Sequence, residues 1–262
     1  SHAKKEIDKL VSNPQKPTFE NTIFQMENTG EQLGRIAGIF FNLNEAETSD
    51  EMQQLAPELS ELITAYSNDV NMNSGLFERI KTIYMDREQL GLNAEQMMLL
   101  QDTYKGFIRG GADLPESKKQ IFRDINQQLA KLTLKFNENL LAETNNFELH
   151  ISNNDDLAGL PDYVKEMAYE EAQSRNKKGW VFTLHFPSFE PFMKYSDKRD
   201  LREKMYRAFT SRCNKNDQYD NKNIIKEIVN LRTQKAILLG YKSYAQMILE
   251  NLKTAGVQQA HK

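Results

Sequence analysis

The chain has 262 residues, enough to bury a substantial core as one large domain or two smaller ones. A hydrophobic fraction of 39% and a charged fraction of 27% are typical of a globular protein, and the net charge of −3 comes from 34 basic and 37 acidic residues without a basic block. This balance argues against nucleic acid as a partner. The longest apolar runs, such as residues 36–41, are too short to cross a membrane.

Helical periodicity dominates residues 1–145 and predicts a series of amphipathic helices. Ser74 is the expected N-cap of one of them, and Asn93 with Gln96 forms an expected capping box for another. Gly110 and Gly111 are expected to end that second helix. The apolar faces are Leu33, Ile36, Phe40 and Leu43; Leu55, Leu59, Leu62 and Tyr66; Phe77, Ile80 and Tyr84; and Met97, Leu100, Tyr104 and Phe107.

Pro115 opens the longest predicted helix. About 27 residues at 1.5 Å each give it a length of roughly 40 Å. Its apolar stripe is typical of a core face rather than of a cofactor site. The stripe consists of Phe122, Ile125, Leu129, Leu132, Phe136 and Leu140.

After residue 145 the apolar period changes from helical to alternating, which predicts two short strands. Their alternating residues are Phe147, Leu149 and Ile151, and then Trp180, Phe182, Leu184 and Phe186. Further helices are predicted from Leu160-Pro161, after Ser196 as a cap, over residues 221–239 and from Ser243. The predicted fold class is therefore mainly α with a minor β element near 147–186. The predicted domains are a helical one at 1–145 and a mixed one at 146–262.

No catalytic constellation is evident from the residues alone. The four histidines, His2, His150, His185 and His261, are more than thirty positions apart, so none forms His-Glu-x-x-His. His150 and His185 lie on predicted strands, on the face opposite the aromatic residues. Cys213 is the single cysteine and is expected to be a buried, idle thiol. Nucleophile elbows and phosphate-binding loops are absent from the sequence, so we predict no catalytic and no metal-binding residue, and the substrate-binding residues stay unassigned.

Three long stretches carry a family likeness. They are NPQKPTFENTI at residues 13–23, followed by FFNLNEA; FNENLLAETNNFEL at residues 136–149, running into DLAGLP; and WVFTLHFPSFEPFMKYSDKRDLREKMYRAFTSR at residues 180–212, continued by LLGYKSYAQMILE. Together they resemble the N-terminal region of the zinc metallopeptidases that include peptidyl-dipeptidase (dipeptidyl carboxypeptidase), oligopeptidase A, thimet oligopeptidase and neurolysin.

The resemblance implies a neurolysin-like, almost wholly helical fold, split by a deep channel with Zn²⁺ on its floor. In that family His-Glu-x-x-His and a later glutamate hold the metal, and the glutamate of the motif activates the zinc-bound water. All of these residues follow the part of the pattern present here, so no ligand is carried over and we expect this chain to bind no Zn²⁺. The implied role is an inactive cleft wall, whose partners are the missing catalytic domain and short unfolded peptides.

The opening NPQKPTFENTI favours a peptidyl-dipeptidase, which releases dipeptides from the carboxyl end of peptides. The alternatives are an endopeptidase like oligopeptidase A and a non-enzymatic helical interaction module. We further expect the two strands to lie near the channel, where a sheet edge could pair with an extended substrate. The chain begins at Ser1-His2, with neither methionine nor an apolar signal segment, as a processed end would. Its single cysteine favours the cytoplasm, with the periplasm as the alternative.

Overall fold

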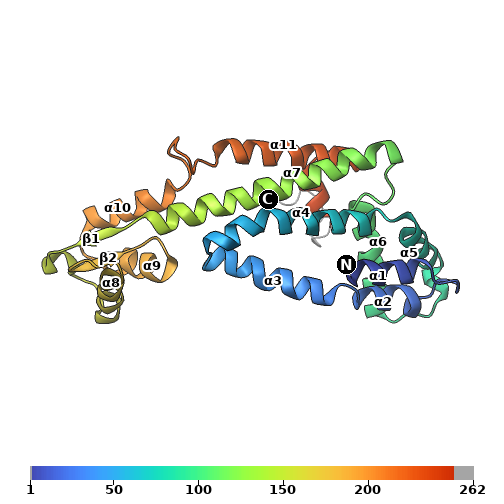
Figure 1. The fold of residues 1–262 in the computed structure, drawn as a ribbon, viewed down its shortest axis with the longest axis horizontal. Helices are drawn as coiled ribbons and strands as arrows, with labels where there is room; N and C mark the ends of the chain where they lie inside the picture. Colours follow the sequence, from blue (N-terminus) through green and yellow to red (C-terminus); the bar gives the residue numbers. More distant parts are fainter. Residues whose placement is uncertain (1, 251–262) are drawn as a thin grey trace. The chain divides into compact units, whose positions relative to one another are not determined.

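The computed structural model describes residues 2–250 and is mainly α-helical, which confirms the predicted fold class (Figure 1). The chain divides into two compact units: unit 1 comprises residues 1–134 and 227–262, and unit 2 comprises residues 135–226. Both boundaries fall inside helices, α7 (Glu116–Asn146) and α11 (Lys222–Leu238), so each of these helices contributes to both units. The predicted division between residues 145 and 146 rests on the change in sequence pattern and stays a prediction.

Unit 1 is built from helices and short helical turns. In chain order they are α1 (His2–Val11), the π-helical turn η1 (Phe19–Phe24), α2 (Gln25–Glu27), α3 (Glu31–Ala46), α4 (Asp50–Asn71), α5 (Ser74–Asp86), the 3-10 turn η2 (Arg87–Gln89), α6 (Ala94–Arg109), the first part of α7, most of α11, and α12 (Tyr244–Leu249). No helix within residues 2–250 is both long enough and apolar enough to cross a membrane.

The core of unit 1 lies among α1, η1, α5 and α6. Its fully or nearly buried side chains are Ile7, Leu10, Phe19, Ile23, Leu76, Phe77, Ile80, Ile83, Leu100, Phe107 and Ala112. Stacked rings extend this core. The ring centroids of Phe77 and Phe107 are 6.4 Å apart, and those of Tyr84 and Tyr104 are 3.9 Å apart. Offset stacking of this kind adds to the stabilisation that apolar burial provides. The predicted faces of the helices at 74–86 and 94–109 are therefore core faces.

Polar contacts fix three helices of unit 1 around Asn126 on α7. The side-chain amide of Asn126 donates to Asn68 Oδ1 of α4 at 2.6 Å, and its Oδ1 accepts from Lys235 Nζ of α11 at 2.7 Å. The Lys235 ammonium also lies 5.0 Å from the centre of the Phe122 ring. Burial lowers the pKa of Lys235, because removal from water disfavours its charged form. The hydrogen bond to Asn126 and the contact with the Phe122 ring offset part of the free-energy cost of burying the Lys235 charge.

Unit 2 combines the remaining helices with a two-stranded sheet. Its elements are the end of α7, β1 (Leu149–Ile151), the 3-10 turn η3 (Asn154–Leu157), α8 (Asp162–Ser174), β2 (Trp180–Phe182), α9 (Phe186–Tyr195), α10 (Arg199–Thr210) and the first turn of α11. The strands are antiparallel, with Leu149 opposite Phe182 and Ile151 opposite Trp180. The core beneath them contains Ile151, Leu157, Leu160, Val164, Ala168, Phe182, Leu184, Phe192, Leu201 and Met205.

The second strand is shorter than predicted. It ends at Phe182, and the predicted strand residue Phe186 instead begins α9 and is exposed. Pro187 lies in the first turn of α9, where its fixed φ angle suits a helix and its missing N–H costs nothing. Ser188 accepts a hydrogen bond from the backbone N–H of Thr183, which turns the chain from strand to helix. Alternation of apolar residues alone did not reveal this turn.

Two of the predicted caps are wrong. Asn73, not Ser74, caps α5, because its Oδ1 accepts from the N–H of Leu76 at 2.9 Å. Ser196 does not cap α10: it follows α9 as that helix's C-cap and accepts from the N–H of Lys198. The capping box of Asn93 and Gln96 and the stop at Gly110 are confirmed. The last helix, predicted from Ser243, begins at Tyr244 with Ser243 as its N-cap.

Helices α3 and α4 exist as predicted, but their apolar faces are not buried. Asn44 is the only buried residue of α3, and Ala56 and Asn68 are the only ones of α4. The long stripe of α7 is a core face at Phe122 and Ile125 and half-buried further on. A predicted apolar stripe therefore marks a helix reliably but does not say what covers the stripe.

The segment before η1, which belongs to the first family-like stretch, is fixed by a buried arginine. The guanidinium of Arg79 on α5 donates to the carbonyls of Asn13 (2.8 Å) and Gln15 (3.3 Å) and to Asn21 Oδ1 (3.2 Å). Arg79 is 8% exposed, and no ion pair is recorded for it among residues 2–250. Its charge is therefore compensated by peptide and amide oxygens alone.

Replacing Arg79 by methionine should destabilise unit 1. The substitution keeps the length of the side chain but removes three hydrogen bonds from a buried cation to partly buried oxygens, which costs about 2–3 kcal/mol. Urea unfolding followed by circular dichroism measures this loss. The matched control is Arg199→Met, since Arg199 is 84% exposed, and it should change stability by less than about 0.5 kcal/mol. Equal stability of the two variants would contradict the role of Arg79.

Candidate functional site

The histidines lie apart in the structure. His150 lies in β1, exposed, and its Nε2 donates to the carbonyl of Lys178 at 2.7 Å. His185 is the exposed N-cap residue of α9 and not a strand residue as predicted, and His2 lies 3.4 Å from Glu6. His261 falls outside the described residues. Within residues 2–250, no three histidine, cysteine or acidic side chains are grouped so that they could hold a metal ion.

Cys213 is buried, as predicted. Burial raises the pKa of its thiol, and the nearby carboxylate of Glu143 raises it further. A thiol with a raised pKa stays protonated at neutral pH and is a poor nucleophile. The structure therefore offers no support for a catalytic cysteine.

A pocket of about 180 Å³ lies beside β2 within unit 2. Its wall is mostly apolar, with one carboxylate and one imidazole. The lining residues are Val164, Met167, Ala168, Glu171, Val181, Thr183, His185, Pro187 and Ser188. The predicted position of the two strands near a channel, and the pairing of a sheet edge with substrate, stay predictions; this pocket is lined by β2 and not by β1.

Ion pairs fix the turn that precedes β2. Glu148 accepts from Lys177 and lies 3.4 Å from Arg175, which in turn contacts the pocket residue Glu171 at 2.6 Å. The hydrogen bond from Lys177 is the main cause that lowers the pKa of Glu148, with the charges of Lys177 and Arg175 acting in the same direction. These contacts connect the start of β1 with the end of α8. They therefore stabilise the frame of the pocket.

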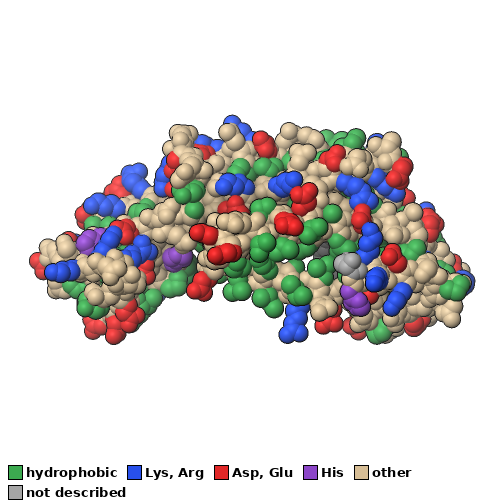
Figure 2. Space-filling model, viewed as in Figure 1, with side chains coloured by type: hydrophobic (Ala, Val, Ile, Leu, Met, Phe, Trp, Pro, Cys, Tyr) green, Lys and Arg blue, Asp and Glu red, His purple; other side chains and the backbone are tan. Residues whose placement is uncertain are grey.

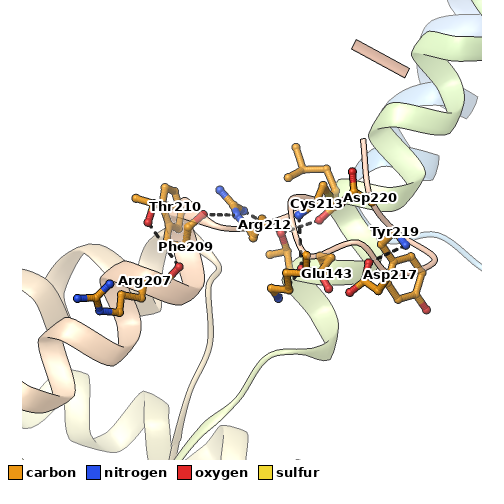
Figure 3. A network of polar contacts seen from close by, with 12 residues as sticks. Glu143, Arg207, Phe209, Thr210, Arg212, Cys213, Asp217, Tyr219 and Asp220 are labelled. Atoms are coloured by element: carbon orange, nitrogen blue, oxygen red, sulfur yellow. Dashed lines mark hydrogen bonds and ion pairs between the residues drawn. The ribbon is translucent and has the colours of Figure 1, made fainter. Parts of the chain in front are cut away.

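In unit 2, a partly buried polar network attaches the segment before α11 to α7 (Figure 3). Glu143 on α7 is 8% exposed and accepts from Lys215 Nζ at 2.6 Å and from the backbone N–H of Cys213 at 3.4 Å. Next to it, Arg212 donates to Thr144 Oγ1 at 2.8 Å and lies 3.9 Å from the centre of the Phe209 ring. Burial lowers the pKa of Arg212.

The segment before α11 is also attached to α7 at its other end, where α11 begins. Asn221 is 1% exposed; its side chain donates to the carbonyl of Phe136 at 3.1 Å and accepts from Asn139 Nδ2 at 2.9 Å. Its backbone N–H donates to the carbonyl of Cys213, a residue whose φ of 54° lies in the left-handed region. That conformation is costly for a residue other than glycine. The hydrogen bonds on both sides of Cys213 maintain it.

This network fixes the backbone of residues 212–221 to α7. Its lysine, arginine and carboxylate are bonded to each other or to backbone, and its thiol is protonated. Sequence reasoning did not single out Asn139, Glu143 or Arg212. A signal was present, because Asn139 and Glu143 stand four residues apart on one helical face and all three residues lie within the family-like stretches.

Comparison with known proteins points to one family. Residues 192–261 match the profile described as Peptidase family M3, and this range includes α10, the segment of the network and α11. The chain is 34% identical over 241 residues to dipeptidyl carboxypeptidase of Escherichia coli and 31% identical over 246 residues to oligopeptidase A of Haemophilus influenzae. Each match covers 92% of this chain. The resemblance to the M3 peptidases is confirmed.

The match extends to more distant relatives but not to their full length. A thimet-like oligopeptidase of Dictyostelium discoideum is 25% identical over 246 residues, again 92% of this chain. The chain spans 35% of the length of the Escherichia coli relative and 36% of that of the Haemophilus influenzae relative. The segment from Arg212 to Asn221, which the network fixes, lies within the range 192–261 that matches the M3 profile.

Glu143→Gln should loosen the segment that carries Cys213. The amide keeps the shape of the carboxylate but loses the charge that faces Lys215, so local opening should become easier by about 1–2 kcal/mol. Reaction of Cys213 with a thiol reagent under native conditions should then accelerate about tenfold, because reaction requires opening. Glu166→Gln, at an exposed position of α8, is the control and should react like the parent chain. Unchanged reactivity in Glu143→Gln would show that this carboxylate does not hold the segment.

Acid should weaken the frame of the pocket through Glu148. Its pKa is lower in the folded than in the unfolded chain, so the unfolded chain binds the proton first as the pH falls. The stabilisation by its ion pairs is complete above the ordinary glutamate pKa of about 4.3 and is lost below it. The difference in unfolding free energy between the parent chain and Glu148→Gln, up to about 1 kcal/mol at neutral pH, should therefore shrink steadily as the pH falls below about 4.3. Trp180 fluorescence during urea unfolding reports it. A difference independent of pH would refute this assignment.

Proposed function

We propose that this chain is the N-terminal, cleft-wall portion of a zinc metallopeptidase that hydrolyses short peptides. The observation that supports this most strongly is the extent of similarity. It runs along 92% of the chain yet covers only 35% of dipeptidyl carboxypeptidase of Escherichia coli, and the sequence contains no His-Glu-x-x-His. Zinc peptidase chemistry of this type requires two imidazoles one helical turn apart and a glutamate on the same helix. In our proposal that helix belongs to sequence that follows residue 262.

Zn²⁺ would supply the activation of water in the longer protein. The side chains of this chain do not suit that metal, since within residues 2–250 no group of three candidate ligands converges. Its own contribution is architectural: the helices form a wall, and the network around Glu143 fixes the start of α11. We expect the chain alone to bind no Zn²⁺ and to be inactive.

The pocket beside β2 is the place where this chain would contact a peptide. Val181 and Thr183 of the strand region line it together with apolar residues of α8, so an extended peptide along β2 could insert an apolar side chain there. Short unfolded peptides are the substrates that a narrow channel admits. We propose no nucleic acid and no membrane as partners.

Release of carboxyl-terminal dipeptides is the proposed reaction, after the dipeptidyl carboxypeptidase of Escherichia coli. Internal cleavage, as the name oligopeptidase A suggests for the Haemophilus influenzae relative, is the alternative, and the identities of 34% and 31% are close. A non-enzymatic helical interaction module would explain the amphipathic helices but not the similarity. We propose a cytoplasmic location from the single buried cysteine, with the periplasm as the alternative.

Two measurements test the proposal. The purified chain should bind less than a stoichiometric amount of zinc and leave short peptides intact, because it lacks the ligand helix. The longer polypeptide, read from the gene beyond residue 262, should contain His-Glu-x-x-His and release dipeptides in a zinc-dependent way. A reading frame that stops without the motif favours the interaction module. Zinc-dependent turnover by the 262-residue chain alone would refute the proposal that the catalytic helix follows residue 262.

A further inference from the structure

The helical hairpin of α3 and α4 exposes large aliphatic side chains that nothing in unit 1 covers. Figure 2 shows hydrophobic side chains at the surface over these helices. We define the α3–α4 apolar face by its most exposed members, which are 47–59% accessible: Ile36, Ile39, Leu43, Leu55 and Leu62. Scattered apolar residues are normal at a protein surface, but a cluster on two adjacent helices marks an interaction site.

The exposed aliphatic residues recur at helical spacing, so they form a stripe along one side of each helix. Ile36, Ile39 and Leu43 lie three and four residues apart on α3, and Leu55 and Leu62 lie two turns apart on α4. Helix α4 is anchored to α7 near its end, where Asn126 donates to Asn68 and Arg123 lies 2.7 Å from Asp69. The contacts with α7 leave Leu55 and Leu62 49% and 59% exposed.

The charge of the hairpin restricts what can cover the face. Residues 31–71 contain eight acidic residues, Glu31, Glu45, Glu47, Asp50, Glu51, Glu58, Glu61 and Asp69, and a single basic one, Arg35. Their sum is −7, in a chain whose net charge is −3. Asp69 and Glu61 pair with Arg123 and Lys131 of α7, so the hairpin keeps a net negative charge after these pairs are set aside. A second copy of this face would be repelled, and so would an anionic membrane or a nucleic acid. A complementary cover has an apolar centre and a rim of lysine and arginine.

We propose that the α3–α4 apolar face is the docking surface for the polypeptide that follows this chain in the longer protein, and that this polypeptide presents an apolar helix face bordered by basic side chains. The inference rests on the proposed function, because it takes the cover from the part of the relatives that this chain does not span. Permanent aliphatic exposure on this scale fits a permanent intramolecular cover better than a transient peptide ligand. The occupant is therefore part of the same protein.

Hydrogen exchange of the longer polypeptide and of this chain, side by side, tests the docking surface directly. Amides of α3 and α4 should exchange at least about tenfold more slowly in the longer polypeptide, because covering the face suppresses local opening. Amides of α5, whose face is already packed in the core of unit 1, serve as the internal control and should not change. Equal exchange of α3 and α4 in the two proteins would overturn the inference. So would slower exchange in this chain on raising its own concentration, which would identify a second copy as the cover.

Variants of the longer polypeptide separate the apolar from the charged contribution. Ile36→Gln, Leu43→Gln and Leu62→Gln together should abolish the added protection, whereas the control Tyr163→Gln with Tyr169→Gln, at exposed positions of α8, should leave it intact. Glu51→Lys with Glu58→Lys should reduce the protection about tenfold more at low salt than at high salt, because salt screens exposed charges. Glu166→Lys with Glu170→Lys is the control for this pair. Protection unaffected by all the hairpin variants would refute the proposal.

The peptidase assay keeps this inference apart from the proposed function. Zinc-dependent activity of the longer polypeptide together with unprotected α3 and α4 would leave the function standing and remove the docking surface. Protection of α3 and α4 in a longer polypeptide without peptidase activity would leave the docking surface standing and remove the proposed function.

Discussion

One helix, α7, is the element on which both units depend. Its 31 residues correspond to about 46 Å at 1.5 Å per residue. Its first part buries Phe122 and Ile125 in unit 1 and bonds α4 and α11 through Asn126. Its last part carries Asn139, Glu143 and Thr144, which bind the segment before α11 in unit 2. The polar residues of α7 thus fix the chain where the apolar stripe is only half-buried.

The buried ionisable groups of this chain stabilise its conformation. Its buried ionisable groups are occupied: the Glu143 carboxylate receives Lys215 and the N–H of Cys213, and the Arg79 guanidinium is bonded to backbone carbonyls. The Cys213 thiol has a raised pKa and stays protonated. Groups in such states stabilise a conformation but do not attack a substrate. The similarity to dipeptidyl carboxypeptidase of Escherichia coli covers 92% of this chain, and the sequence contains no His-Glu-x-x-His.

The α3–α4 apolar face and the polar network around Glu143 differ in whether this chain alone supplies their contacts. The hydrogen bonds of the network around Glu143 join residues of unit 2 alone, so the network can form as this chain folds. The α3–α4 apolar face is satisfied by nothing in unit 1, although its residues have regular helical spacing. Helices with such faces depend on tertiary packing for most of their stability. The two observations together distinguish what this chain completes alone from what it offers to a partner.

Much of the fold could be read from the residues. The helical period of residues 33–43 and 55–66, the capping box at Asn93 and the stop at Gly110 each specify local geometry, because they act through hydrogen bonds within a few residues. The absence of paired imidazoles likewise excluded a zinc motif without any structure. The tertiary structure alone decided that Phe186 begins a helix, that Glu143 and Asn221 meet a segment some 70 to 80 residues away, and that Leu43 and Leu62 stay exposed. The reason is physical: a period in sequence shows which side chains share a face, whereas burial and pairing depend on which distant surface reaches that face.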